Sequence, residues 1–457
     1  MHNGRANPPR YDYSLLPLPR PNGPVRSLPM ADDRLVLRGP RLADGRTVDV
    51  RLRGELIEAV GTSGSLSGLQ GRSRTRSRAG GPHAREARAD RGRAGEEPGG
   101  QGRASHVDLS GYLLLPAPAE PHAHHDTALT ATAPGPPSAT PAALRRRITE
   151  AALLQLGHGA TAQRTHIRIG DAGGLDALEA ALETRRALRG LAELSTVAVP
   201  RVLTGRAGAE NRALLNEAAK MGAGALGGAP DLDPDPAGYL DIVFGLAEEH
   251  GCAIDLHTEG EDPARLARLA AAAGACRFGV TIGPCTGLAR LPRETADRAA
   301  ARLAAAGVRV VCLPQGPCGL AASPGGTPVR LLAAAGVRVA AGGGALRDVA
   351  NPVGRGDPLD AAHQLAARGA CGPLDAYLAV SRLARAAIGL PEVRVEAGFP
   401  AELLAVRGDT VTGALSLAYS RLVIHRGRIV ARTSAVREYC GAPAAEGGPE
   451  LPRQATG

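Results

Sequence analysis

The stretch GYLLLPAPAEPHAHHDTALT (residues 111–130) begins with a short apolar run and ends with three histidines within four positions. In a β-strand, residues two positions apart lie on the same face, so His122 and His124 can reach one ion while His125 points to the other side. Neutral imidazole is a preferred ligand of divalent metals. The stretch therefore predicts a strand that ends at a metal site.

Seven further apolar runs follow this one, and helix-like segments rich in Leu and Ala separate most of them. Eight strands alternating with helices predict a (β/α)8 TIM barrel, in which functional side chains gather at the C-terminal ends of the strands. His257 ends the fifth run and is therefore expected beside His122 and His124. The eight runs are residues 113–124, 160–169, 192–200, 224–230, 252–260, 277–285, 308–316 and 337–344.

Both ends of the chain have strand-like patterns that contain turn residues. Residues 31–62 and 106–115, together with 396–435, predict one small composite β-sandwich, which leaves 116–395 for the barrel. Other segments have too few apolar residues to offset the entropy lost on ordering, so we expect them to be disordered. These are a leader at 1–30, an Arg/Gly-rich insert at 63–105 and a tail at 436–457.

The net charge of +9 is concentrated, because the segments 1–29 and 64–105 together supply eight of these charges. No nucleic-acid-binding motif accompanies them, so solvated tails are favoured over an RNA or DNA partner. The seven cysteines lack zinc-finger or CxxC spacing, which favours reduced thiols and a cytoplasmic protein. We recognise no signal peptide and no run of 18 apolar residues, so we expect no membrane partner. Met30 is an alternative candidate for the first residue of the protein.

The motif EPHAHHDTALT resembles the EPHxHLDxxxT strand of cytosine-deaminase-like members of the amidohydrolase superfamily. The resemblance continues in order through QRTHIRIGD, GGAPDLDPDP, IDLHTEG, NPVGRGDPL and RLVIHRGRIV, and it covers residues 33–62 and 106–435. It implies a (β/α)8 barrel with a β-sandwich from both chain ends, one divalent metal ion (Zn or Fe), and hydrolysis of a C–N bond in a small heterocycle. By this resemblance the metal ligands are His122, His124 and His257.

The resemblance also implies groups that this sequence lacks. The eighth-strand aspartate, a ligand that also takes the proton of the attacking water, falls on Gly344. The sixth-strand histidine that assists this water falls on Pro284, and the fifth-strand glutamate that carries a proton to the ring falls on Gly260. Each positioned acid or base is worth about 10²–10⁴ in rate. We therefore expect the family's chemistry to be impaired or lost.

Neighbouring side chains are candidates for the missing roles. Glu259 and Asp348 are candidate catalytic residues, although strand alternation predicts that Glu259 turns away from the pocket and Asp348 follows the eighth strand in a loop. Arg201 falls on the position of the family's substrate-binding glutamine, and a guanidinium there favours an anionic ligand. His166, at the end of the second strand, is a further candidate for the pocket wall. Lys220 is the only lysine and is predicted at a helix end, which argues against a lysine-bridged pair of metals.

Three interpretations follow. The first is a pseudoenzyme that keeps the barrel and binds a small heterocyclic ligand or pairs with an active relative. The second is an active metal-dependent hydrolase or deaminase with a rebuilt acid–base set. The third is a chain that has drifted because nothing uses it. The sequence also allows self-association into a homo-oligomer, and a three-histidine site could still hydrolyse an activated ester or lactone slowly.

Overall fold

The computed structural model describes the chain between the two termini, with internal gaps. The leader 1–30, the tail 436–457 and residues 68–104 of the insert, all expected to be disordered, lie outside the described residues. The described ranges are 34–67, 105–133, 135–170, 173–318, 326–417 and 420–435. Within them, we find no helix that is both long and apolar enough to span a bilayer.

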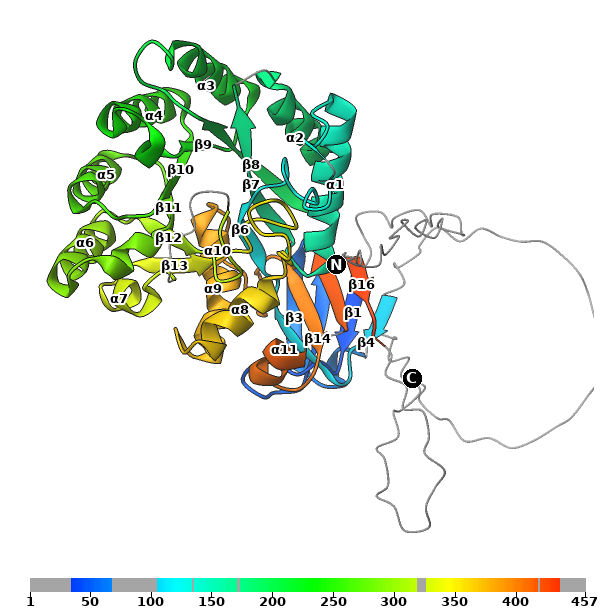
Figure 1. Cartoon of the computed structure of the whole chain (residues 1–457). Helices are drawn as coiled ribbons and strands as arrows, with labels where there is room; N and C mark the ends of the chain where they lie inside the picture. The colour runs from blue at the N-terminus through cyan, green and yellow to red at the C-terminus, as the bar shows by residue number, and fades with distance from the viewer. Residues whose placement is uncertain are drawn as a thin grey trace, which may run out of the picture.

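Eight parallel strands form the predicted barrel sheet, paired in chain order from β6 to β13 (Figure 1). Each strand lies within the run that predicted it. The strands are β6 (Ala119–Ala123), β7 (Ala162–Ile169), β8 (Glu193–Pro200), β9 (Ala225–Gly228), β10 (Ala253–Thr258), β11 (Val280–Pro284), β12 (Arg309–Cys312) and β13 (Arg338–Ala341).

Helices α1 to α7 surround these strands on the outside (Figure 1). Several helices begin with proline after a side chain that accepts a hydrogen bond from the first turn, as Asp235, Asp262 and Asp357 do for α4, α5 and α8. The helices are α1 (Pro141–Gly157), α2 (Asp176–Ala187), α3 (Ala209–Met221), α4 (Pro236–His250), α5 (Pro263–Ala275), α6 (Arg293–Ala305), α7 (Val329–Ala334), α8 (Pro358–Ala367), α9 (Pro373–Val380), α10 (Arg382–Ala387) and α11 (Val411–Leu417), with short 3₁₀ helices at Ser65–Ser67, Pro230–Leu232 and Thr286–Arg290.

The barrel closes between its first and last strands through a buried carboxylate. Glu120 accepts hydrogen bonds from the amides of His122 (3.0 Å) and Gly343 (2.8 Å), and the amide of Gly344 donates to the carbonyl of His122 at 3.0 Å. A β-carbon added at Gly342 or Gly343 would lie only 2.6 or 2.9 Å from the Glu120 carboxylate oxygens. The glycine run after β13 therefore makes room for the carboxylate that closes the barrel.

The N-terminal end of the barrel is covered by α10. Ala384 and Ala387, on α10, belong to one buried apolar cluster with Ala119 and Ala162. Ala119 is the first residue of β6, and Ala162 is the first residue of β7. The opposite, C-terminal end carries the histidines. The fold thus closes one end of the barrel and leaves the other for a site.

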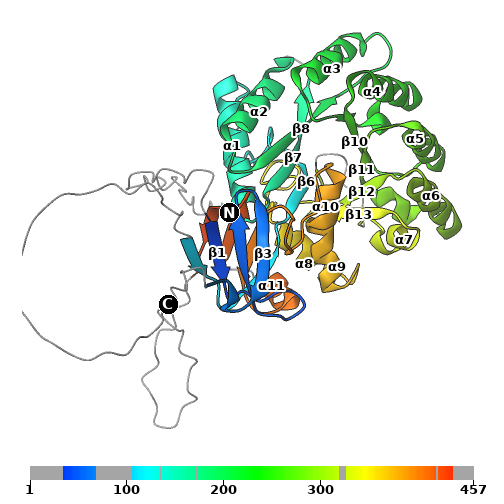
Figure 2. The ribbon, with the colours of Figure 1, turned by 180° about the vertical axis from the view of Figure 1, so that it is seen from behind.

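Both chain ends contribute to a β-sandwich, as predicted, and Figures 1 and 2 both show it beside the barrel near β6. Its two four-stranded sheets enclose a separate apolar core that includes Leu37, Leu114 and Ile424. One sheet contains β1 (Arg34–Arg38), β2 (Val48–Arg53), β3 (Leu56–Thr62) and β4 (Ser105–Asp108), and the other contains β5 (Tyr112–Pro116), β14 (Leu403–Arg407), β15 (Arg421–His425) and β16 (Arg428–Thr433).

Candidate metal centre

Three imidazoles converge at the C-terminal ends of the barrel strands. His122 lies on β6, His124 follows this strand directly, and His257 lies on β10. The Nε2 atom of His124 is 3.3 Å from Nε2 of His122 and 3.3 Å from Nε2 of His257. Nitrogen ligands about 2.0–2.1 Å from one tetrahedral ion are about 3.3–3.4 Å apart. The three nitrogens therefore fit a single divalent ion.

Burial keeps these three rings in the form that binds metal. It lowers the pKa of His124 to about 4 and the pKa of His257 to about 3, and it lowers the pKa of His122 well below its ordinary value. All three imidazoles are consequently neutral at pH 7, and a neutral ring offers a nitrogen lone pair to a cation. The neutral state of the three rings and the distances between their Nε2 atoms both favour a metal site.

His125, the fourth histidine in this region, takes a structural role, as the strand alternation predicts. It is fully buried, and its Nε2 lies 2.9 Å from the amide oxygen of Gln155 on α1. Its backbone amide donates to the hydroxyl of Thr165 at 2.9 Å. These contacts hold the chain just beyond the first barrel strand and leave the neighbouring His124 directed toward the site.

A buried polar group lies beneath the three histidines. The ring of His166, on β7, lies 4.0 Å from that of His122 between centroids, and its Nε2 is 3.3 Å from Oδ1 of Asp255. The other oxygen of Asp255 accepts a hydrogen bond from Arg164 at 3.0 Å. His166 therefore packs against the candidate ligand His122 inside the barrel, next to the buried Arg164–Asp255 ion pair.

Two cavities open over the C-terminal ends of the strands. One of about 400 Å³ is bordered by His124, His166 and His257, and also by Arg201 and Asp348. This volume lies within the range of small-molecule sites. The structure therefore brings both predicted substrate-binding residues, Arg201 and His166, to the same cavity as the imidazoles.

The second cavity, of about 330 Å³, lies over β11 and β12 and is bordered by Glu259, Pro284 and Cys318. Glu259 borders this second cavity and is absent from the lining of the cavity that contains His124 and His257. Its carboxylate accepts a hydrogen bond from the hydroxyl of Thr286. Of the two candidate catalytic residues, Glu259 is therefore the one whose carboxylate lies at the second cavity of the barrel mouth.

Asp348 borders the histidine cavity, but its carboxylate stabilises a turn. One oxygen accepts from the hydroxyl of Thr127 at 2.8 Å, and the other accepts from the amides of Ala350 (2.8 Å) and Asn351 (3.1 Å). Lys220 lies on α3, where it is 3.6 Å from Glu217, so it does not bridge two metals at this site. These contacts assign structural roles to both side chains.

At three positions the chain lacks a side chain that the family resemblance implies, and the structure shows the surroundings of each. Gly344 and Gly260 both have positive φ, of 68° and 70°. A β-carbon at Gly260 would point toward Leu288 and Leu266, at 3.2 and 3.4 Å, so a side chain there would enter apolar packing. Pro284 ends β11 and supplies neither a ligand nor a titratable group.

One candidate ligand was missed from the sequence. The Sγ of Cys318, in the loop after β12, joins the side-chain nitrogens of His122, His124 and His257 in a group of atoms that all lie within 4.8 Å of one another. The sequence pattern treats the cysteines as scattered. The signal that could have identified Cys318 is its position after the seventh barrel strand, on the same edge as the histidines.

Comparisons with known proteins identify the family. A sequence model of the amidohydrolase family matches residues 154–431 of this chain. A pterin deaminase of Rhizobium rhizogenes is 32% identical over 229 residues, which are 46% of this chain and 52% of that protein, so the match spans about half the length of this relative. An N-isopropylammelide isopropyl amidohydrolase of a Pseudomonas species is 26% identical over 294 residues, 56% of this chain and 69% of that protein.

Solved structures extend the comparison to almost the whole described fold. N-isopropylammelide isopropylaminohydrolase of Burkholderia multivorans is 26% identical with a TM-score of 0.71, covering 88% of this chain and 100% of that one. 5-Methylcytosine deaminase of Klebsiella pneumoniae, at 22% identity and a TM-score of 0.70, shares the fold over 90% of this chain and 100% of that one. Together with the family match over more than half of the sequence, these observations confirm the resemblance that the motifs indicate: the chain belongs to the amidohydrolase family.

Proposed function

We propose that this protein is a metal-dependent hydrolase of C–N bonds in small heterocycles, with turnover limited by the loss of proton-transfer groups. The observation that carries the proposal is the convergence of the Nε2 atoms of His122, His124 and His257 at the open end of the barrel. Imidazole nitrogens at this separation suit one Zn or Fe ion. The family match supports the class of reaction.

The substrate class rests on the relatives and on the cavity. By their names, the relatives act on a pterin and on an N-alkylated ammelide, both compact nitrogen-rich rings. The cavity of about 400 Å³ next to the imidazoles is large enough for one such ring. Arg201 at its edge would favour a substrate with an anionic or strongly electron-rich oxygen, because a guanidinium donates charge-assisted hydrogen bonds.

The chemistry requires both activation and proton transfer. A bound divalent ion lowers the pKa of its water to about 7 and polarises the substrate. The chain would supply His122, His124 and His257 to hold this ion, and the walls of the cavity to position the ring. At Gly344, Pro284 and Gly260 it has no side chain that could move a proton, so we expect rates reduced by about 10²–10⁴ for each absent group.

A second candidate function has one observation in its favour. Glu259 borders the second cavity at the barrel mouth, of about 330 Å³, and its carboxylate accepts a hydrogen bond from the hydroxyl of Thr286. A carboxylate in this place could take over the acid–base role and make the protein an active deaminase with a rebuilt site. The two functions differ in whether turnover depends on Glu259.

Ammonia and amine release from pterin, cytosine and N-alkylated triazine substrates, with Zn or Fe added, tests both functions. We expect slow turnover that is lost in His122→Ala and retained in Glu259→Gln. Fast turnover lost in both variants would support the rebuilt site instead. Metal binding without any turnover would leave a heterocycle-binding pseudoenzyme, and a protein that binds no metal would overturn the proposal.

A further inference from the structure

The thiol of Cys318 lies where a fourth metal ligand would be needed. Its Sγ and the ligand nitrogens of His122, His124 and His257 are all within 4.8 Å of one another. Cys318 is half-buried, and it borders both cavities at the barrel mouth. Thiolate sulfur and imidazole nitrogen together form a donor set that Zn prefers.

The bare backbone at Gly344 allows the loop carrying this cysteine to approach. A β-carbon at position 344 would lie 3.3 Å from Cδ1 of Leu313 and 3.5 Å from the carbonyl oxygen of Gly316, both in the loop after β12. A larger side chain there would compete with the loop for this space. Gly344, where the family resemblance implies a metal ligand, is therefore the residue against which the loop after β12 packs.

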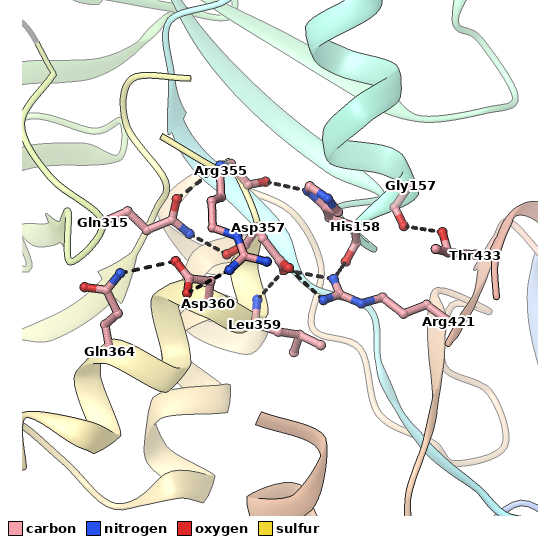
Figure 3. Close-up of polar contacts among 11 residues, drawn as sticks. Gly157, His158, Gln315, Arg355, Asp357, Leu359, Asp360, Gln364, Arg421 and Thr433 are labelled. Carbon is pink, nitrogen blue, oxygen red and sulfur yellow. Dashed lines mark hydrogen bonds and ion pairs between the residues drawn. The ribbon is translucent and has the colours of Figure 1, made fainter. Parts of the chain in front are cut away.

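Half-buried polar contacts anchor the same loop (Figure 3). The side-chain amide of Gln315 donates to the carbonyl of Asp357 at 2.5 Å, and its oxygen accepts from the amide of Gly356 at 3.1 Å. Asn351 donates to the carbonyl of Gln315 at 3.0 Å. Three contacts around a single residue fix the loop three positions before Cys318, so the placement of its thiol is supported by the surrounding structure.

We propose that the thiolate of Cys318 is the fourth metal ligand, giving a three-histidine, one-cysteine site. The inference rests on the proposed function and refines it. On binding, the S–H bond of Cys318 breaks, a sulfur–metal bond forms and the proton is released to solvent, with no change in oxidation state. Four protein ligands would fill a tetrahedral coordination sphere, so the water of the proposed function would have to bind as a fifth ligand, and this would add to the loss of proton-transfer groups in slowing turnover.

Cobalt loading of the full-length protein tests this proposal without an activity assay. Wild-type protein with one Co(II) per chain should show a thiolate-to-cobalt charge-transfer absorption, and Cys318→Ser should lose it. The matched control is Cys371→Ser, which alters another half-buried thiol outside the site and should keep the absorption. Because changes beyond the ligand shell already weaken binding by about 10–100-fold, removal of the sulfur ligand should weaken it by about 100-fold or more.

A second variant guards against a folding defect. Cys318→Asp retains a metal-binding group, so it should bind Co(II) more tightly than Cys318→Ser while lacking the charge-transfer absorption. One Co(II) per wild-type chain without this absorption, or equal affinity in wild type and Cys318→Ser, would overturn the cysteine ligand and leave the three-histidine site intact. Failure of the wild-type protein to bind any metal would overturn the proposed function as well.

Discussion

At the scale of single residues, the convergence of the three histidines follows from patterns in the sequence, whereas the approach of Cys318 to them depends on the path of a loop. His122 lies on β6 and His124 follows directly after this strand, two positions later, so their common face follows from the strand period. His257 follows from the rule that functional residues lie at C-terminal strand ends. Cys318 is near them only because a loop folds back over Gly344, and no spacing in the sequence encodes that approach.

The fit between Glu120 and the glycines after β13 also belongs to this scale. A methyl group at Gly343 would lie 2.9 Å from the Glu120 carboxylate and 3.1 Å from Cα of Gly356. Gly343→Ala should therefore destabilise the protein by about 1–3 kcal/mol through overpacking, as measured by chemical denaturation. The control Gly245→Ala lies within helix α4 with open space around it, so it should be neutral or stabilising. Equal effects of the two substitutions would contradict the packing argument.

At the scale of elements, the eight barrel strands could be predicted because short, mostly apolar runs alternate with helix-like segments along the chain. Some helix starts are indicated by an aspartate or threonine followed by proline, as at Asp262 and Pro263. Glu259 lies just after β10 and borders the second cavity, over β11 and β12, instead of the cavity that contains the histidines. Loop paths depend on contacts between distant segments and could not be read from local patterns.

Gln315 tests whether the loop after β12 is held in place for metal binding. Gln315→Leu removes the hydrogen bonds to Gly356 and Asp357, so the loop should lose its anchor. We expect a decrease of about 10–100-fold in Co(II) affinity with a weaker charge-transfer absorption, since supporting contacts tune metal sites to this extent. Gln364→Leu, on the neighbouring helix α8, is the matched control. An unchanged spectrum in Gln315→Leu would show that the loop needs no such support.

At the scale of the whole molecule, a buried ion pair joins the barrel to the sandwich. Arg421, on β15, donates to both carboxylate oxygens of Asp357 at 2.8 and 2.6 Å and to the carbonyl of His158 at 2.7 Å (Figure 3). Asp357 also caps helix α8. The sequence predicts that both chain ends form one sandwich, but the pairing of Arg421 with a residue 64 positions earlier depends on the tertiary fold.

Removal of Arg421 should destabilise the protein, because it leaves the buried carboxylate of Asp357 without its ion-pair partner. Arg421→Met should lower the free energy of unfolding by about 3–5 kcal/mol, measured by urea denaturation. The control is Arg394→Met, which removes an exposed partner of Glu392 and should cost no more than about 1 kcal/mol. Similar losses in the two variants would argue that the buried pair has no special role.

The same ion pair gives a pH dependence. Burial alone would raise the pKa of Asp357, but the hydrogen bonds and charge of Arg421 hold this pKa below its ordinary value of 3.8. The ionised carboxylate therefore stabilises the fold fully above this ordinary value, and its contribution is lost as the pH falls through the lowered pKa. The stability difference between wild type and Asp357→Asn should be constant near neutral pH and should shrink below about pH 4. A difference that grows in acid would contradict the assignment.

The central claim is that the barrel mouth binds one metal ion through the three histidines, and elemental analysis of purified full-length protein tests it most directly. Wild-type protein dialysed against Zn or Fe should retain about one ion per chain, because its ligand nitrogens are already placed for a single site. His257→Ala should retain much less than one ion while remaining folded. A wild-type protein without stoichiometric metal, or a variant that binds as much metal as wild type, would contradict the account.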